Sequence, residues 1–147
     1  MPETVQLFIT CLLDTLYPQV GESVVRVLHR VGARVEFPQG QTCCGQPAFN
    51  AGLRAEARPV AMHTIQVFEA STGTVVVPSG SCAAMIRHGY PELFRDDPTW
   101  RRRAQSLAER TCEFSEFLVD RLGVVDLGVR FPARLAYHAS CHLLREL

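Results

Sequence analysis

The sequence contains no lysine, because all fifteen of its basic residues are arginine. Fifteen acidic residues balance them, so the formal net charge is zero. A neutral chain has no general electrostatic attraction for nucleic acid or for an anionic membrane. Arg101-Arg102-Arg103 is a short basic run beside Trp100, and a solvated helix face explains it better than nucleic-acid binding. We therefore expect no nucleic-acid partner.

Targeting and membrane-spanning segments are also missing from the sequence. Residues 1–6 lack the basic stretch that begins a secretory signal, and the longest apolar runs, such as residues 74–78, are too short to cross a bilayer. No Gly-x-Gly-x-x-Gly fingerprint of a dinucleotide site is present. The missing signal and the short apolar runs predict a cytoplasmic protein without a transmembrane segment. In that reducing compartment, six cysteines are more typical of metal-binding or catalytic thiols than of disulfides.

The chain has the length and the alternating pattern of one α/β domain. Its 147 residues, 47% hydrophobic and 20% charged, are enough for a single core. Strands are expected at residues 5–9, 33–37, 74–77 and 134–138. Helices are expected at residues 18–31 and 55–70, from Cys82 onward, and from Asp97-Pro98 to about residue 122; Pro59 suits the second of these only within its first turn. This order predicts an open, mainly parallel four-stranded sheet flanked by helices.

Five of the six cysteines follow predicted strands. Cys11, the pair Cys43-Cys44, Cys82 and Cys141 each come shortly after one. The carboxyl ends of parallel strands meet at one edge of a sheet, which is where open α/β sheets place their sites. We therefore expect these thiols to gather at that edge.

The spacing favours a metal or cluster site made of Cys11, Cys43, Cys44 and Cys82. Thirty-one residues separate Cys11 from Cys43-Cys44-Gly45, and thirty-six more precede Cys82. Four thiolates suit a zinc ion or an iron–sulfur cluster, with [4Fe–4S] the type we expect. Neighbouring Cα atoms lie about 3.8 Å apart, so adjacent cysteines fit the several irons of a cluster more easily than one zinc tetrahedron. Zinc stays open as the alternative ligand.

Local sequence supports this site. Gly45 lets the chain turn sharply beside an inorganic core. Cys82 is expected in the first turn of a helix, where the N–H groups and the helix dipole favour a thiolate. Ser79-Gly80-Ser81, just before it, can donate hydrogen bonds to sulfur and raise a reduction potential.

The cysteine pattern resembles the CCG cysteine-rich domain, a family that includes a subunit of heterodisulfide reductase, the iron–sulfur subunit of glycolate oxidase and the lactate-utilization proteins. The lactate-utilization branch is the most similar, and the resemblance runs through nearly the whole chain. The segments that carry it are Cys43-Cys44-Gly45-Gln46-Pro47-Ala48-Phe49-Asn50, Ser79-Gly80-Ser81-Cys82-Ala83-Ala84-Met85 and Tyr137-His138-Ala139-Ser140-Cys141-His142-Leu143-Leu144-Arg145-Glu146-Leu147.

Two departures from the family pattern limit what the resemblance implies. The full motif ends in Cys-x-x-Cys, but Met85 stands at its last position, which leaves four ligands and puts the family's noncubane cluster in doubt. Cys141 resembles the first cysteine of a second motif whose Cys-Cys-Gly is absent. We therefore expect residues 1–132 to form a first CCG domain and residues 133–147 to begin a truncated second one.

The resemblance implies an iron–sulfur subunit that relays electrons in a cytoplasmic complex oxidising L-lactate or glycolate. Its partners would be the other subunits of that complex, which would carry the substrate chemistry. Two alternatives stay open: a thiol–disulfide enzyme of the heterodisulfide reductase type, against which Met85 counts, and a structural module that holds zinc.

Other reactive residues have simpler interpretations. Cys112 is expected in the middle of a helix as a core or half-buried thiol. His138 and His142 flank Cys141, and packing at a strand end explains them better than metal binding. A Cys43–Cys44 disulfide would be a strained oxidation product of the empty site.

Overall fold

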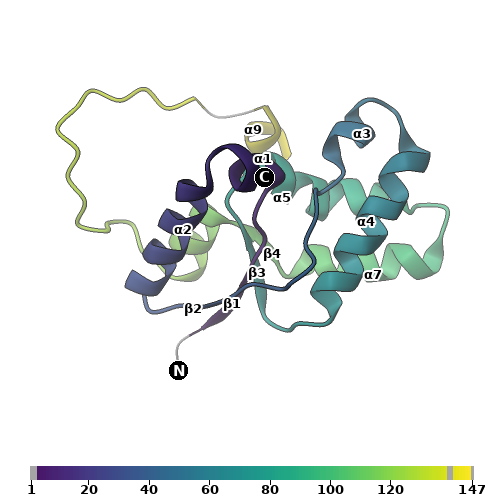
Figure 1. Ribbon diagram of the computed structural model, residues 1–147, viewed down its shortest axis with the longest axis horizontal. Helices are drawn as coiled ribbons and strands as arrows, with labels where there is room; N and C mark the ends of the chain where they lie inside the picture. The colour runs from purple at the N-terminus through teal and green to yellow at the C-terminus, as the bar shows by residue number, and fades with distance from the viewer. Residues whose placement is uncertain (1–2, 139–140, 147) are drawn as a thin grey trace.

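Four parallel strands form the centre of the molecule (Figure 1). A computed structural model describes residues 3–138 and 141–146. In that part of the chain the strands lie in the order β2-β1-β3-β4. Their bounds are β1 Thr4–Leu7, β2 Arg34–Glu36, β3 Thr74–Val77 and β4 Thr111–Glu113. The predicted α/β fold with a four-stranded parallel sheet is confirmed.

Helices cover both faces of this sheet (Figure 1). One face packs against α2 and the segment after β4, through the buried side chains of Val24, Leu28 and Phe117. The other face packs against α4, which presents the predicted stripe of Ala61, Ile65 and Phe68, and against the helices that follow β3. The helices on the way from β1 to β4 are α1 Cys11–Leu16, α2 Pro18–Arg30, α3 Gln46–Asn50, α4 Arg54–Glu69, α5 Gly80–Ala84, the π-helix η1 Met85–Gly89, α6 Tyr90–Leu93 and α7 Pro98–Glu109.

The first three strands and the helices between them follow the sequence pattern closely. Val75, Val76 and Val77 of β3 are fully buried, as expected for a β-branched strand with helices on both sides. Helix α2 ends with Gly32 just beyond it at φ 85°, the left-handed conformation that glycine accommodates. The prediction that Pro59 lies in the first turn of its helix is wrong. Pro59 is the sixth residue of α4 and lies inside the helix.

The fourth strand differs from the prediction. Residues 98–122 were expected to form one helix, but α7 ends at Glu109 and the chain enters β4, whose Cys112 pairs with Val76 of β3. The short helix α8 Phe114–Glu116 and the π-helix η2 Phe117–Arg121 follow. Pairing with a buried strand outweighs local helix propensity here, because a three-residue strand gains its backbone hydrogen bonds and the burial of all three residues at once.

The predicted strand at residues 134–138 is wrong. These residues have no strand partner, and Leu135 and Tyr137 are exposed. Cys141 therefore does not follow a strand, and it begins the helix α9 Cys141–Glu146, which packs against α5. Within the described residues, no helix has both the length and the apolar character needed to cross a membrane.

The strand order creates a switch point between β1 and β3. The chain leaves β1 toward β2 on one side, and it leaves β3 toward β4 on the other. Connections that diverge in this way leave a crevice at the carboxyl ends of the two strands, which is where open α/β sheets bind their ligands. Cys11 lies four residues beyond β1, and Cys82 lies five residues beyond β3.

Candidate cysteine site

Three connections bring Cys11, Cys43, Cys44 and Cys82 together at the carboxyl edge of the sheet. Cys11 begins α1 after β1, Cys43-Cys44 lie between β2 and α3, and Cys82 lies in α5 after β3. The predicted gathering of these four thiols at one edge is therefore what the structure shows. Cys141 does not share the predicted route to this edge, because no described strand leads to it.

The four thiols form two hydrogen-bonded pairs. The outer pair joins the Sγ atoms of Cys11 and Cys43 at 3.6 Å. The inner pair joins the Sγ atoms of Cys44 and Cys82 at 3.4 Å. Cys11 is exposed and Cys43 half-buried, whereas Cys44 and Cys82 are buried. Adjacent cysteines thus face different partners.

Local structure positions each sulfur. Thr10 caps α1 by accepting a hydrogen bond from the N–H of Leu13 at 3.3 Å, which fixes the helix start at Cys11. Gly45 has φ 81°, so the chain turns sharply after Cys44, and its N–H donates to the Cys43 sulfur at 3.4 Å. Ser79 caps α5 and accepts from the N–H of Cys82 at 3.5 Å, which places Cys82 in the first turn as the sequence predicts.

The inner pair has opposed pKa shifts. The hydrogen bond that the Cys44 thiol donates lowers the pKa of Cys82 to about 7; burial opposes this effect, and the Ser79 and Ser81 hydroxyls add to it. The same hydrogen bond, together with burial, raises the pKa of Cys44. Cys82 is therefore the thiol of this pair that ionises first.

Charges on the sulfurs reach one another across the site. Burial raises the pKa of Cys11, and the hydrogen bond with Cys43 and the charges of Cys43 and Cys82 raise it further. The Tyr90 phenol lies against this site and donates to the Cys44 carbonyl at 2.9 Å. Burial is the main cause of its raised pKa, and charge on Cys44, Cys82 and Cys43 raises it further. Ionisation of one sulfur therefore makes ionisation of its neighbours less favourable.

The donor set fits thiolate coordination of a metal ion or a cluster. Zn–S bonds of about 2.3 Å imply sulfurs about 3.8 Å apart around one tetrahedral metal, which is close to the spacing within each pair. Across the described residues, no three or more His, Cys, Asp or Glu side chains are arranged to hold a single metal ion. Four thiolates in two such pairs suit either a metal ion or a cluster.

Residues 5–87, from β1 into the π-helix η1, match the CCG cysteine-rich domain. The chain belongs to this family. The match contains all four cysteines of the two pairs. No solved structure matched the chain.

Curated relatives of this CCG chain include proteins named lactate utilization protein A. The chain is 51% identical over 144 residues to lactate utilization protein A of Exiguobacterium sp., and this match covers 97% of the chain and 58% of the relative. It is 50% and 51% identical over 143 residues to the proteins of that name from Bacillus pumilus and Shouchella clausii, covering 97% of this chain and 59% of each. The chain spans less than two thirds of the length of these relatives.

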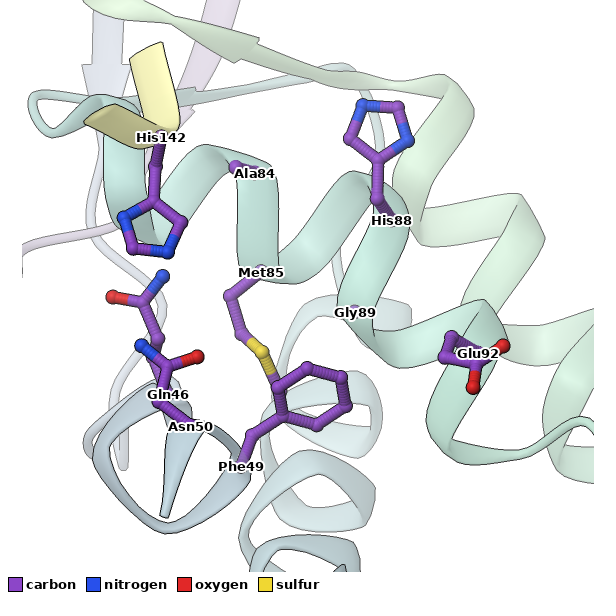
Figure 2. A pocket seen from close by; sticks show the side chains of 9 residues that line it. All are labelled: Gln46, Phe49, Asn50, Ala84, Met85, His88, Gly89, Glu92 and His142. Carbon is purple, nitrogen blue, oxygen red and sulfur yellow. The ribbon is translucent and has the colours of Figure 1, made fainter. Parts of the chain in front are cut away.

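Met85, which stands where the resemblance implies the last cysteine of the CCG pattern, lines a cavity. The cavity has a volume of about 230 Å³ and lies between α3, the helical segment after Cys82 and α9. Figure 2 shows the buried Met85 side chain extending toward Phe49. A Cβ on Gly89 would lie 2.4 Å from the Met85 sulfur, so glycine at that position makes room for methionine.

The remaining reactive residues lie away from the two pairs or at their margin. Cys112 is buried as expected, but it lies in β4 and not in a helix, and burial raises its pKa. His142 lines the cavity in Figure 2, and His138 lies in the exposed segment before α9.

Sequence reasoning missed Tyr90, whose phenol contacts the site from α6. Its position after Gly89 and before Pro91 carries no motif, and a tyrosine on a helix is ordinarily a core residue. Only the fold shows that its hydroxyl reaches the backbone of Cys44.

Proposed function

We propose that the chain is an iron–sulfur module that transfers electrons in a system oxidising L-lactate. Cys11, Cys43, Cys44 and Cys82 would hold the cluster, and [4Fe–4S] is the type we propose. When bound, such a cluster accepts and releases single electrons. The observation that carries the proposal is the convergence of four thiols from three connections, in two pairs, at the switch point of the sheet.

The surroundings of the sulfurs support this role. The Gly45 N–H and the Ser79 and Ser81 hydroxyls offer hydrogen bonds to sulfur, and such bonds set the reduction potential of a cluster. The inner pair is shielded from water while Cys11 is exposed, which leaves one side of the site open to an electron-transfer partner. The name of the relatives favours lactate over glycolate as the substrate of the whole system.

The organisation of the longer protein is part of the same proposal. We propose that residues 1–132 form a first CCG domain and that residues 133–147 begin a second. The protein would work in the cytoplasm beside other subunits that bind the 2-hydroxy acid. The chain's own residues would hold the cluster and fix its distance from those subunits.

Metal analysis under exclusion of oxygen tests this proposal. The chain is purified anaerobically, and iron, sulfide and zinc per chain are measured together with the EPR spectrum of the reduced sample. We expect iron and sulfide in equal amounts and a reducible cluster signal. Cys112→Ser is the matched control, because that buried thiol lies in β4 and its loss should leave the signal unchanged. Stoichiometric zinc without iron or sulfide would show the structural zinc alternative instead.

A further inference from the structure

A glutamine side chain connects the two segments that carry the outer pair. The Gln41 Oε1 accepts from the N–H of Ile9 at 3.1 Å, and its Nε2 donates to the carbonyl of Leu7 at 2.8 Å. Ile9 lies two residues before Cys11, and Gln41 lies two residues before Cys43. The carboxamide therefore bridges the chain on its way to both outer sulfurs.

This bridge continues the sheet where backbone pairing has ended. The last register pair of β1 with β2 joins Gln6 to Glu36, and β2 stops there. Beyond that point the Gln41 amide offers one acceptor and one donor to the β1 side, as a peptide group of a parallel strand would. A third contact, from Nε2 to the Pro38 carbonyl at 3.0 Å, fixes the amide within its own loop.

A second glutamine does the same for the inner pair. Gln46 begins α3 two residues after Cys44, and its Nε2 donates to the carbonyl of Ser81 at 2.9 Å. Ser81 directly precedes Cys82. Figure 2 shows Gln46 at the start of α3, projecting toward the segments above it. Each cysteine pair thus has one amide that connects its two backbone segments.

We propose that Gln41 and Gln46 are positioning residues of the cysteine site, Gln41 for the Cys11–Cys43 pair and Gln46 for the Cys44–Cys82 pair. The purpose of this arrangement rests on the proposed cluster function, although the contacts themselves do not. Ionised sulfurs repel one another, so holding them within 4 Å requires fixed backbones. A neutral amide fixes two backbones through hydrogen bonds and adds no charge beside the thiolates.

The test measures how readily each pair closes to a disulfide in the metal-free protein. Two protein thiols reduce one oxidised glutathione, a protein disulfide forms, and two glutathione thiols are released. The equilibrium with a glutathione buffer gives the effective molarity of the pair. The outer pair is isolated by Cys44→Ser, Cys82→Ser and Cys141→Ser. The inner pair is isolated by Cys11→Ser, Cys43→Ser and Cys141→Ser.

The expected result is a crossed pattern. Gln41→Ala should lower the effective molarity of the outer pair about tenfold, as expected for losing one or two hydrogen bonds. The inner pair should change by no more than about twofold, the usual limit for separate sites. Gln46→Ala should lower the effective molarity of the inner pair about tenfold and change that of the outer pair by no more than about twofold. If both pairs respond equally to each variant, or neither responds, the proposal is wrong.

Gln6→Ala is the matched control for general loosening of the sheet. Gln6 is a buried glutamine of β1, and its Nε2 donates to Glu36 at 2.8 Å and to the Thr72 carbonyl at 3.0 Å, neither of which belongs to a segment that carries a site cysteine. It should lower the unfolding temperature without changing either effective molarity. If it lowers them as Gln41→Ala does, the role of Gln41 is only structural and the proposal fails.

A second variant keeps the test decisive if Gln41→Ala folds poorly. Gln41→Glu preserves the size of the side chain and the acceptor for Ile9, but it loses the donor for Leu7 and Pro38. It should lower the effective molarity of the outer pair alone. The His63 ring also holds this loop, through the Gly40 carbonyl at 2.7 Å, so the loop keeps an anchor in both variants. Iron content is measured separately in the wild type. A wild type without iron would overturn the proposed function and leave the crossed pattern to decide the positioning role.

Discussion

The outer and inner cysteine pairs have nearly the same sulfur spacing, 3.6 and 3.4 Å, in different surroundings. The outer pair includes an exposed thiol on α1, a helix without a single buried residue. The inner pair lies among buried side chains beneath the Tyr90 phenol. Spacing alone therefore does not define the chemistry of a thiol pair, because water access decides what can replace a missing ligand.

The largest expected difference between the pairs concerns ligand loss. Cys82→Ser should reduce iron affinity by more than about 100-fold, the upper range for removing a supporting partner of a ligand. Cys11→Ser should reduce it much less, because water can reach the exposed position and complete the coordination. Iron and sulfide per chain after anaerobic reconstitution measure both. Equal losses would contradict the distinction between the pairs.

A smaller effect is expected at the turn that separates the pairs. Gly45→Ala should cost about 1–2 kcal/mol of folding stability, because alanine disfavours a positive φ, and the new Cβ would lie 3.4 Å from Val60. Gly52→Ala is the matched control, with φ 79° and open space around it. Denaturant unfolding should show a comparable cost for both, and only Gly45→Ala should also lower iron content. Normal iron content in Gly45→Ala would show that the turn does not fix Cys44.

A further expected effect is the pH dependence that the inner pair gives the metal-free protein. The pKa of Cys82 is about 7 in the folded state, below its ordinary value of 9.0, so its contribution to stability is complete above pH 9 and is lost as the pH falls through 7. Cys44→Ala removes the donor and should flatten this dependence. Cys44→Ser retains a hydroxyl donor and should preserve most of it.

Unfolding free energy measured from pH 6 to pH 9, with Cys82→Ser as the blank, checks this prediction. If Cys44→Ala and Cys44→Ser behave alike, the Cys44 hydrogen bond is not the cause of the lowered pKa. Removing an outer thiol should change the profile less than removing Cys44, because the outer thiols act on Cys82 through charge and not through a hydrogen bond.

The parts of the fold that the sequence predicts correctly are those whose pattern reflects burial. Val75-Val76-Val77 is a continuous β-branched run because helices cover both sides of it. The cysteine edge follows from the positions of β1, β2 and β3 alone, and the place of Cys82 in the first turn of a helix is predicted correctly. These features depend on neighbours in sequence.

The parts that the sequence misses depend on partners far along the chain. Thr111-Cys112-Glu113 has no strand-like pattern and becomes a strand only because the open side of β3 accepts it. Leu135 and Tyr137 alternate as a strand would, yet no described strand pairs with them. The sequence also does not predict the contacts of Gln41, Gln46 and Tyr90 with the cysteine segments. Each of these hydrogen bonds joins residues that are 32 to 46 positions apart.

A single peptide bond, between Cys43 and Cys44, joins the two pairs. Its planarity makes it a rigid unit, with Cα atoms about 3.8 Å apart whatever the rest of the protein does. Cys43 belongs to the outer pair and Cys44 to the inner pair, so a movement of the Cys43 backbone also displaces the Cα atom of Cys44. The Cys43–Cys44 peptide bond therefore couples the backbone position of the outer pair to that of the inner pair.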